Sequence, residues 1–329
     1  MKNLFIIGTP LQLINAIEAV NHFKLNNNIL VLVHRSTESN KKQIQDIIDL
    51  YEWEEIIEIP YKSNFSILKY TRLIKYLKVY MYGYIFISKL EVVPMLVLAN
   101  TTKQKVFLLD DGALTIAIYE KKIKVNKLNK YNFKELRFIF FGLNIKIKDK
   151  INLFTLFNLK SENGNEVVKN NLDYLRITYL SEEKIKFFKY DRNIIYFLGQ
   201  PLDSFIDIEI YKSSIESLIK KYNKKIIYIC HRKESKHNQE MLSSIECSSF
   251  ELIDISMPVE LYFLYNKIYP SHIISYCSTA VTTVGILYND CKSNYIQLPQ
   301  SKKYDNSDQK YFYGAFEKKK ILTFDDLGI

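Results

Sequence analysis

The sequence is poor in the residues that mark several specialised classes of protein. Among its 329 residues are only four cysteines, nine glycines and one tryptophan. The cysteines, Cys230, Cys247, Cys277 and Cys291, stand far apart without a Cys-x-x-Cys pair, and three of them lie in apolar runs. This distribution argues against a disulfide framework or a cysteine zinc site, and it favours reduced thiols in a cytoplasmic protein.

Long hydrophobic runs are absent as well. The apolar stretch at residues 4–7 is interrupted by Gly8, Thr9 and Pro10, so it lacks the continuous core of a signal peptide. No segment provides the roughly 20 apolar residues that a membrane-spanning helix needs. We therefore expect a cytoplasmic protein.

Several well-known catalytic motifs are also missing. The sequence contains no P-loop, no G-x-G-x-x-G, no G-x-S-x-G and no H-E-x-x-H. Their absence argues against a kinase-like ATPase, an ordinary NAD-dependent dehydrogenase, an α/β-hydrolase and a zinc protease. The five histidines show no metal-ligand spacing, so we expect no bound metal.

Positive charge, in contrast, is abundant. Lysine and arginine number 46 against 36 acidic residues, which gives a net charge of +10 and indicates an anionic partner. Between Lys121 and Lys160 the lysines alternate with aromatic and aliphatic residues. Such a segment is typical of a solvated surface over a core, or alternatively of a patch that rests on the cytoplasmic face of the inner membrane. The basic residues follow no recognised nucleic-acid-binding motif, so we expect no nucleic acid partner.

The hydrophobic pattern predicts an α/β fold. Short apolar strands alternate with helical segments, which implies parallel, doubly wound sheets. The pattern loosens at about 120–190, as expected for an insertion and linker, and then resumes. We therefore predict two Rossmann-like domains with a cleft between them, at 1–190 and 191–329. The expected strands are 3–8, 28–34, 55–60, 84–88, 105–109, 193–199, 225–230, 250–255, 272–277 and 294–298.

Polar or ionisable residues follow five of these strands. In open parallel sheets ligands bind at the carboxyl ends of the strands, so these segments are candidate parts of a site. The segments are Gly8–Gln12, Asp110–Gly112, Gly199–Asp203, His231–Glu234 and Ser278–Thr279.

Two of these segments suit the binding of an anion. Ser278 and Thr279 open an apolar helix, where hydroxyls and free N–H groups form an anion seat, or alternatively only cap the helix. His231, followed by Arg232 and Lys233, could donate a proton or a hydrogen bond to a leaving phosphate. The alternative for His231 is an exposed loop histidine without a role.

The carboxylates Asp110, Asp111 and Asp203 are candidates for a general base that activates a hydroxyl nucleophile. A second interpretation is that Asp110 and Asp111 hold Mg²⁺ on a nucleotide diphosphate. Consecutive residues of an extended segment point to opposite faces, which makes joint binding of one ion less natural.

The order of these segments along the chain also resembles a known family. The stretches NLFIIGTPLQLINAIEA, LLDDG, FLGQPLD, CHRKE, YCSTAVTT and ILTFDD span nearly the whole sequence. Together they resemble glycosyltransferase family 52, the bacterial lipooligosaccharide and capsule sialyltransferases. The resemblance implies a GT-B fold and inverting, metal-independent transfer of sialic acid from CMP-Neu5Ac to a terminal galactose, without a cofactor.

The resemblance assigns catalytic roles to three residues. Asp203 would be the base that deprotonates the acceptor hydroxyl, with Asp111 of the shared Asp-Asp-Gly motif as its rival. His231 would assist departure of the CMP phosphate. The family's His-Pro pair is His231-Arg232 here, and the lost proline would otherwise fix the loop after the histidine.

The resemblance also implies a donor site. Ser278 and Thr279 would hold the phosphate, and Glu260 would bind the ribose or the cytosine. The loops that follow two neighbouring strands would add Gly199, Gln200 and Lys233.

Other functions remain open at this point. A different CMP-linked keto sugar or a UDP- or GDP-hexose could be the donor. A basic nucleic-acid-binding protein and an inactive homologue that keeps the fold for assembly belong to different classes. The sequence is also compatible with a homodimer, and it fixes neither the linkage nor the acceptor.

Overall fold

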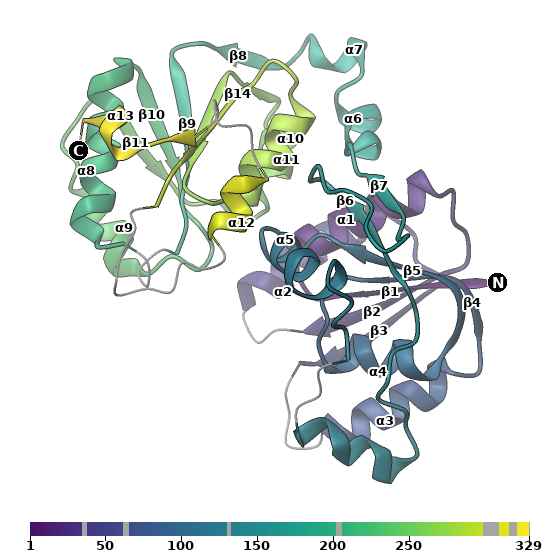
Figure 1. The fold of residues 1–329 in the computed structure, drawn as a ribbon. Helices are drawn as coiled ribbons and strands as arrows, with labels where there is room; N and C mark the ends of the chain where they lie inside the picture. Colours follow the sequence, from purple (N-terminus) through teal and green to yellow (C-terminus); the bar gives the residue numbers. More distant parts are fainter. Residues whose placement is uncertain are drawn as a thin grey trace. The chain divides into compact units, whose positions relative to one another are not determined.

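The computed structural model describes residues 1–34, 38–61, 66–129, 133–201, 206–298, 309–315 and 321–328. The chain forms two compact units, Met1–Tyr174 (unit 1) and Leu175–Ile329 (unit 2) (Figure 1). The predicted base Asp203 lies outside the described residues.

Unit 1 is built on a parallel sheet of seven strands in the order β3-β2-β1-β4-β5-β6-β7. All of its strand pairs are parallel, as the alternating pattern predicts. The strands are β1 (Lys2–Ile7), β2 (Asn28–His34), β3 (Glu55–Pro60), β4 (Met81–Ile87), β5 (Thr102–Leu109), β6 (Ile151–Thr155) and β7 (Val167–Lys169).

Both faces of this sheet are covered, which explains why its inner strands are almost wholly apolar. On one face the rings of Phe5, Phe86 and Phe107, from three neighbouring strands, form a row. The ring centroids of Phe5 and Phe86 are 4.5 Å apart, and those of Phe86 and Phe107 are 5.6 Å apart. Leu4 and Ile85, one residue before Phe5 and Phe86, lie in the aliphatic core of the unit.

Helices flank the sheet of unit 1, with α1 and α4 on opposite faces in Figure 1. Thr9 precedes α1 and Pro10 is its first residue, and the Thr9 side chain makes no capping hydrogen bond. The helices are α1 (Pro10–His22), α2 (Glu38–Ile48), α3 (Ser66–Leu77), α4 (Val92–Asn100), α5 (Leu114–Ile118), the π-helix η1 (Tyr119–Ile123) and the 3-10 helix η2 (Phe133–Phe141).

Unit 2 repeats the architecture with a six-stranded sheet in the order β11-β10-β9-β13-β14-β15. A two-stranded parallel sheet pairs β8 (Lys189–Asp191) with β12 (Ile268–Pro270). The strands of the larger sheet are β9 (Ile194–Leu198), β10 (Lys225–Ile229), β11 (Phe250–Ile253), β13 (His272–Ser275), β14 (Lys292–Ile296) and β15 (Ile321–Leu322).

Helix α6 (Asp173–Tyr179) crosses from unit 1 into unit 2. The remaining helices of unit 2 are α7 (Glu182–Ile185), α8 (Ile208–Tyr222), α9 (Lys236–Ser243), α10 (Val259–Tyr265), α11 (Thr279–Leu287), α12 (Gln309–Gly314) and α13 (Phe324–Leu327). No helix in these described stretches is long and apolar enough to cross a membrane.

The segment at about 120–190 differs from the predicted insertion and linker. Every residue of β6 is buried, and β6 and β7 extend the sheet of unit 1 beyond β5. Burial of this apolar strand fixes it in the domain core. The structure divides the chain after Tyr174, ahead of the predicted boundary at 190/191, because β8 pairs within unit 2.

The strand orders define where ligands are expected to bind. In unit 1 the chain starts at β1, winds outward to β3, and returns to β4 on the other side of β1. Unit 2 does the same with β9 and β13. The direction of winding reverses between β1 and β4 and between β9 and β13, and such switch points open a crevice at the carboxyl ends of the strands.

Candidate functional site

In unit 1, three side chains meet at the carboxyl edge of the sheet around its switch point. The carboxylate of Asp111, which follows β5, lies with one oxygen 2.5 Å from Nζ of Lys89, which follows β4. Its other oxygen accepts a hydrogen bond from Nε2 of Gln12, in the first turn of α1. The side chains of Lys89 and Asp111 are 13% and 12% exposed. The carboxylate is therefore held in place while part of it stays accessible.

Gln12 is itself fixed by the backbone at the end of β1. Its Oε1 accepts a hydrogen bond of 2.7 Å from the N–H of Gly8, which leaves its amide N–H groups to face Asp111. A Cβ at Gly8 would lie 2.7 Å from the carbonyl oxygen of Val33, so no larger residue fits without a shift. Asn40 of α2 donates to the Gly8 carbonyl at 3.0 Å.

Asp110 has a different environment from its neighbour. It is fully buried, and its carboxylate accepts hydrogen bonds from Oγ1 of Thr155 at 2.9 Å and from the N–H of Leu156 at 2.5 Å. Burial raises the pKa of Asp110 to about 7, and the two hydrogen bonds oppose that rise. Asp110 thus joins the end of β5 to the end of β6.

The backbone turns sharply after this pair. The N–H of Asp111 donates to Oγ1 of Thr115 at 2.8 Å, and Gly112 has a φ of +70°, a conformation that favours glycine. The two carboxylates of the Asp-Asp-Gly motif consequently have separate partners. Asp111 has the accessible position, and Asp110 has the structural one.

In unit 2, Gln200 connects the two strands at the switch point. It follows β9, and its Oε1 accepts a hydrogen bond of 2.9 Å from the N–H of Cys277, just after β13. The Ser275 hydroxyl is 3.4 Å from the same oxygen. The preceding Gly199 is packed so closely that a Cβ would lie 2.5 Å from the hydroxyl of Tyr228.

The loop that carries His231 is a β-turn closed by Glu234. The N–H of Glu234 donates to the His231 carbonyl at 2.7 Å, so Arg232 and Lys233 are the two central residues of the turn. The buried Glu234 carboxylate accepts from the His231 N–H at 3.0 Å and from the Tyr228 hydroxyl at 2.5 Å.

This turn holds the loop at the position where the sequence resemblance expects a proline. Arg232 is the second residue of the turn, where proline is favoured because its fixed φ suits that position. Here the Glu234 carboxylate binds the backbone of His231 directly and fixes the loop from inside the domain.

The turn also determines which nitrogen of His231 is available. Nδ1 accepts a hydrogen bond of 3.1 Å from the N–H of Lys233, so the neutral ring carries its proton on Nε2. Burial, and then the charges of Arg232 and Lys233, lower the pKa of His231 to about 4. Near neutral pH, His231 is therefore an uncharged hydrogen-bond donor.

Ser278 and Thr279 lie at the start of α11, as predicted. The Ser278 side chain accepts a hydrogen bond of 3.3 Å from the N–H of Ala280 and caps the helix. Both residues are half-buried. The capping interpretation therefore holds for Ser278, whose hydroxyl hydrogen remains able to donate.

Glu260, in the first turn of α10, is buried and accepts a hydrogen bond of 2.5 Å from Oγ1 of Thr283 in α11. Burial raises the pKa of Glu260, and the positive charge of Arg232 counteracts this as a smaller effect. The charge of Arg232, in the turn after β10, thus acts on the acidic residue that the resemblance assigns to the nucleotide.

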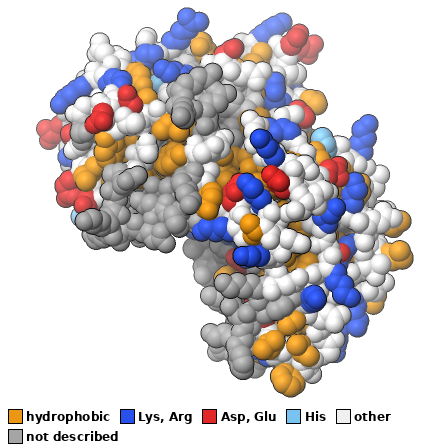
Figure 2. All heavy atoms as spheres, viewed as in Figure 1, with side chains coloured by type: hydrophobic (Ala, Val, Ile, Leu, Met, Phe, Trp, Pro, Cys, Tyr) orange, Lys and Arg blue, Asp and Glu red, His pale blue; other side chains and the backbone are white. Residues whose placement is uncertain are grey.

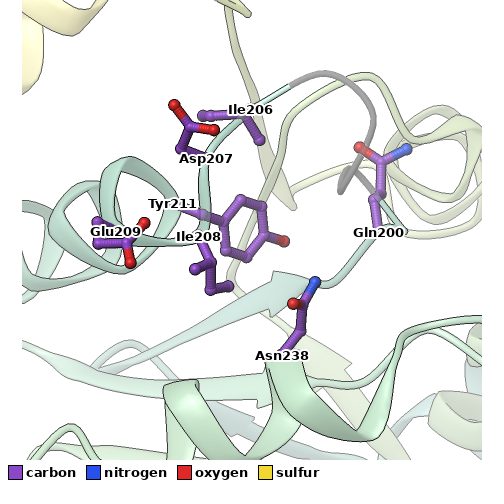
Figure 3. A pocket seen from close by; sticks show the side chains of 7 residues that line it. All are labelled: Gln200, Ile206, Asp207, Ile208, Glu209, Tyr211 and Asn238. Carbon is purple, nitrogen blue, oxygen red and sulfur yellow. The ribbon is translucent and has the colours of Figure 1, made fainter.

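A pocket of about 190 Å³ lies beside Gln200. Figure 3 shows the ring of Tyr211 at its centre, with its hydroxyl on the side of Gln200 and Asn238. Ligand pockets usually measure about 300–1,000 Å³, so this one could hold only part of a nucleotide sugar. Its lining residues are Gln200, Ile206, Asp207, Ile208, Glu209, Tyr211 and Asn238.

The structure adds Lys89, which the sequence did not single out and which contacts the predicted site residue Asp111. It also gives Glu234, part of the predicted segment after β10, a specific contact with the N–H of His231. Lys89 follows an expected strand directly, a position that could have revealed it. Across the described ranges, no group of three or more His, Cys, Asp or Glu side chains could hold a metal ion. All four cysteines are free thiols.

Comparison with solved structures establishes the GT-B fold. A UDP-GlcNAc 2-epimerase from Methanocaldococcus jannaschii is 14% identical with a TM-score of 0.56, over 99% of this chain and 90% of that chain. The GT-B domain of a sialyltransferase from Photobacterium damselae is 11% identical with a TM-score of 0.51, over 98% and 100%. An α/β-galactoside α-2,3-sialyltransferase from Photobacterium phosphoreum is 11% identical with a TM-score of 0.51, over 99% and 98%.

Residues 3–296 match the model of a family described as alpha-2,8-polysialyltransferase (POLYST). The match covers most of the sequence, so the chain belongs to the alpha-2,8-polysialyltransferase family. By this family membership it is a sialyltransferase. Membership of glycosyltransferase family 52 stays a prediction. The search of curated protein sequences found no match to this chain.

Proposed function

We propose that this protein transfers sialic acid from CMP-Neu5Ac to a hydroxyl of a bacterial surface glycan, with inversion and without a metal ion. Asp111 removes the proton of the acceptor hydroxyl, and the oxygen attacks C2 of the sialic acid. The bond from C2 to the phosphate oxygen breaks, and CMP leaves with the electron pair.

The observation that carries this proposal is the contrast between Asp110 and Asp111. A general base must reach its substrate and must be ionised. Asp111 is partly accessible and contacts the cation of Lys89, whereas Asp110 is fully buried and bound to Thr155 and Leu156. Asp111 is therefore the base in this proposal, in place of Asp203, the first choice from the sequence.

Departure of CMP needs hydrogen bonds to the phosphate, whose negative charge increases as the bond breaks. His231 supplies such a donor, since its Nδ1 accepts from Lys233 and its N–H is on Nε2. Ser278 and the N-terminus of α11 add a hydroxyl and a positive dipole end. Neutral donors and a helix end together replace the charge that a metal ion would provide.

Other residues of unit 2 bind the nucleotide part of the donor. Glu260 accepts hydrogen bonds from the ribose or the cytosine, and Gln200, Gly199 and Lys233 complete the donor side. A monophosphate leaving group carries less charge than a nucleotide diphosphate, which fits a site with few cations. UDP- and GDP-hexoses are for this reason the less favoured donors.

The family description also bears on the acceptor. Its α-2,8 linkage favours a terminal sialic acid as the acceptor, whereas the sequence resemblance predicted a terminal galactose. Both acceptors present a hydroxyl that Asp111 can deprotonate in the same way, so the chemistry is shared.

The test is transfer from CMP-Neu5Ac to two labelled acceptors, lactose and an α-2,8-linked sialic acid oligomer, each with and without EDTA. We expect product in EDTA, and longer sialic acid oligomers if the family description holds for this chain. Product from lactose alone would support the galactose acceptor. Loss of all product in EDTA, restored by Mg²⁺, would contradict the metal-independent mechanism.

A further inference from the structure

The end of η2 in unit 1 exposes a set of large hydrophobic side chains. Phe140 is 90% exposed and Ile139 is 52% exposed, and Phe141 and Leu136 are exposed to a lesser degree. Within 136–141 only Phe138 is buried, and it packs in the hydrophobic core of unit 1. Exposed apolar residues that cluster in this way mark interaction sites.

A pocket of about 430 Å³ adjoins these residues and shares Ile139 with them. Lys146 and Lys148, both exposed, lie in the segment that follows η2 and line the pocket. The full lining is Leu98, Ala99, Thr101, Lys103, Ile139, Leu143, Asn144, Ile145, Lys146, Lys148 and Asp149.

The balance of charge in this pocket is positive. Its one acidic residue, Asp149, lies 2.8 Å from Nζ of Lys103, whose side chain is only 5% exposed. Lys103 therefore neutralises the negative charge of Asp149. Lys146 and Lys148 then make the electrostatic potential at the mouth of the pocket positive. An anionic group is therefore the favoured ligand.

Helix α3 contacts η2 and carries a further exposed apolar side chain, Leu68, which is 47% exposed. Figure 2 shows hydrophobic side chains gathered beside Lys and Arg at the end of unit 1 where α3 lies in Figure 1. The apolar and basic groups are thus neighbours on one surface.

We propose that this surface, formed by Leu136, Ile139, Phe140, Phe141, Lys146 and Lys148 and called here the η2 surface, binds anionic phospholipid membranes. Phe140 and its neighbours enter the boundary between headgroups and acyl chains, and the two lysines bind lipid phosphate groups at the pocket. Aromatic side chains beside lysines are suited to such an interface, because membrane binding combines apolar burial with attraction to anionic lipids.

The basic and apolar side chains of the η2 surface together favour a membrane as its binding partner over a second copy of the chain. A second copy of the chain would bring Lys146 and Lys148 of each copy close to like charges, which is unfavourable. A membrane supplies anionic groups and an apolar layer at the same time. The proposal uses none of the residues assigned to sialyl transfer and is independent of that function.

The experiment is flotation of the full chain with vesicles of phosphatidylcholine alone or with added phosphatidylglycerol. The test variants are Phe140→Ser and the pair Lys146→Glu, Lys148→Glu. Matched controls in unit 2 are Phe187→Ser, at a phenylalanine that is 70% exposed, and the pair Lys186→Glu, Lys220→Glu at exposed lysines. Thermal melting verifies that each variant is folded.

We expect the wild type and both controls to bind phosphatidylglycerol vesicles and to dissociate as salt rises. The lysine pair variant should lose on the order of tenfold or more in partitioning, since each basic residue contributes about fivefold near an anionic surface. Phe140→Ser should bind more weakly at all salt concentrations. Equal binding by the test variants and the wild type would overturn the proposal. So would a dimer of the wild type that Phe140→Ser converts to a monomer without changing vesicle binding.

Discussion

Asp110 and Asp111 are consecutive in the chain, yet their carboxylates have different partners. Asp110 is fully buried between β5 and β6, whereas Asp111 contacts Lys89 at 2.5 Å and remains 12% exposed. Because successive side chains of an extended segment point in opposite directions, one motif supplies a structural and an accessible carboxylate. We therefore expect a substitution of Asp111 to affect activity and a substitution of Asp110 to affect stability.

Asp111→Asn should remove most of the transferase activity. If Asp111 is the general base, kcat should fall by about 10²–10⁴-fold while the affinity for CMP is unchanged. Turnover at saturating donor and calorimetric titration with CMP measure the two effects. Asp46→Asn, at an exposed position on α2, is the control. Activity close to wild type in Asp111→Asn would shift the role to another acid, with Asp203 the first candidate.

Asp110 should make the stability of the protein depend on pH. Its pKa is about 7 when folded and near 3.9 when unfolded, so the folded state holds the extra proton between these values. The proton on folded Asp110 therefore stabilises the protein most at a pH below the unfolded pKa. This stabilisation decreases as the pH rises to about 7, and above that the free energy of unfolding no longer depends on Asp110 protonation.

Asp110→Asn isolates this contribution. The stability of the wild type relative to Asp110→Asn should increase by roughly 1–3 kcal/mol between about pH 7.5 and about pH 5. Urea unfolding of both proteins at several pH values measures the difference. A difference that stays constant with pH would mean that Asp110 remains ionised in the folded protein.

His231→Ala should weaken the interaction with the leaving phosphate. Loss of a hydrogen bond to a charged group typically costs about 1.5–3 kcal/mol, or roughly 10–150-fold in kcat/KM for the donor. His231→Asn keeps an N–H donor and should recover part of the loss. The pH profile of the wild type should show no ionisation of His231 near pH 6.5, since its pKa is about 4. His237→Asn, an exposed histidine of unit 2, serves as the control.

Gly199→Ala should destabilise unit 2. The new Cβ would lie 2.5 Å from the hydroxyl of Tyr228 and 2.8 Å from Oε2 of Glu234, both buried. Overpacking of this kind costs about 1–3 kcal/mol and would disturb the carboxylate that fixes the His231 loop. Denaturant unfolding and CMP titration should both detect it. Gly314→Ala has nothing within 4 Å of the new Cβ and should be almost neutral. Equal stability of the two variants would contradict this reasoning.

Most of the sheet could be predicted from the sequence because its strands are short apolar runs between polar turns. The structure contains β2 and β3 with the predicted limits, 28–34 and 55–60. Strands β6 and β7 were missed. β6 follows a long irregular segment rich in lysine, and its five residues are identified as a strand mainly by pairing with β5. Periodicity within a segment carries no information about such distant partners.

The same limit applies to the candidate site. Ionisable residues at strand ends identified Asp111 and His231, because the carboxyl ends of parallel strands are the usual binding edge. The contact between Lys89 and Asp111 depends on β4 lying between β1 and β5, and strand order is a property of the whole sheet. Glu234 reaches back to the N–H of His231 only because the chain turns at 232–233.

Each unit uses an uncharged amide to connect the two sides of its switch point, Gln12 in unit 1 and Gln200 in unit 2. An amide has no proton to gain or lose over the pH range in which Asp110 and His231 titrate. In unit 2 this connection joins the Gln200 amide to the backbone N–H of Cys277, so neither partner is ionisable and the spacing of the two strand ends is independent of pH. In unit 1 the amide of Gln12 reaches the Asp111 carboxylate, so that connection includes an ionisable partner.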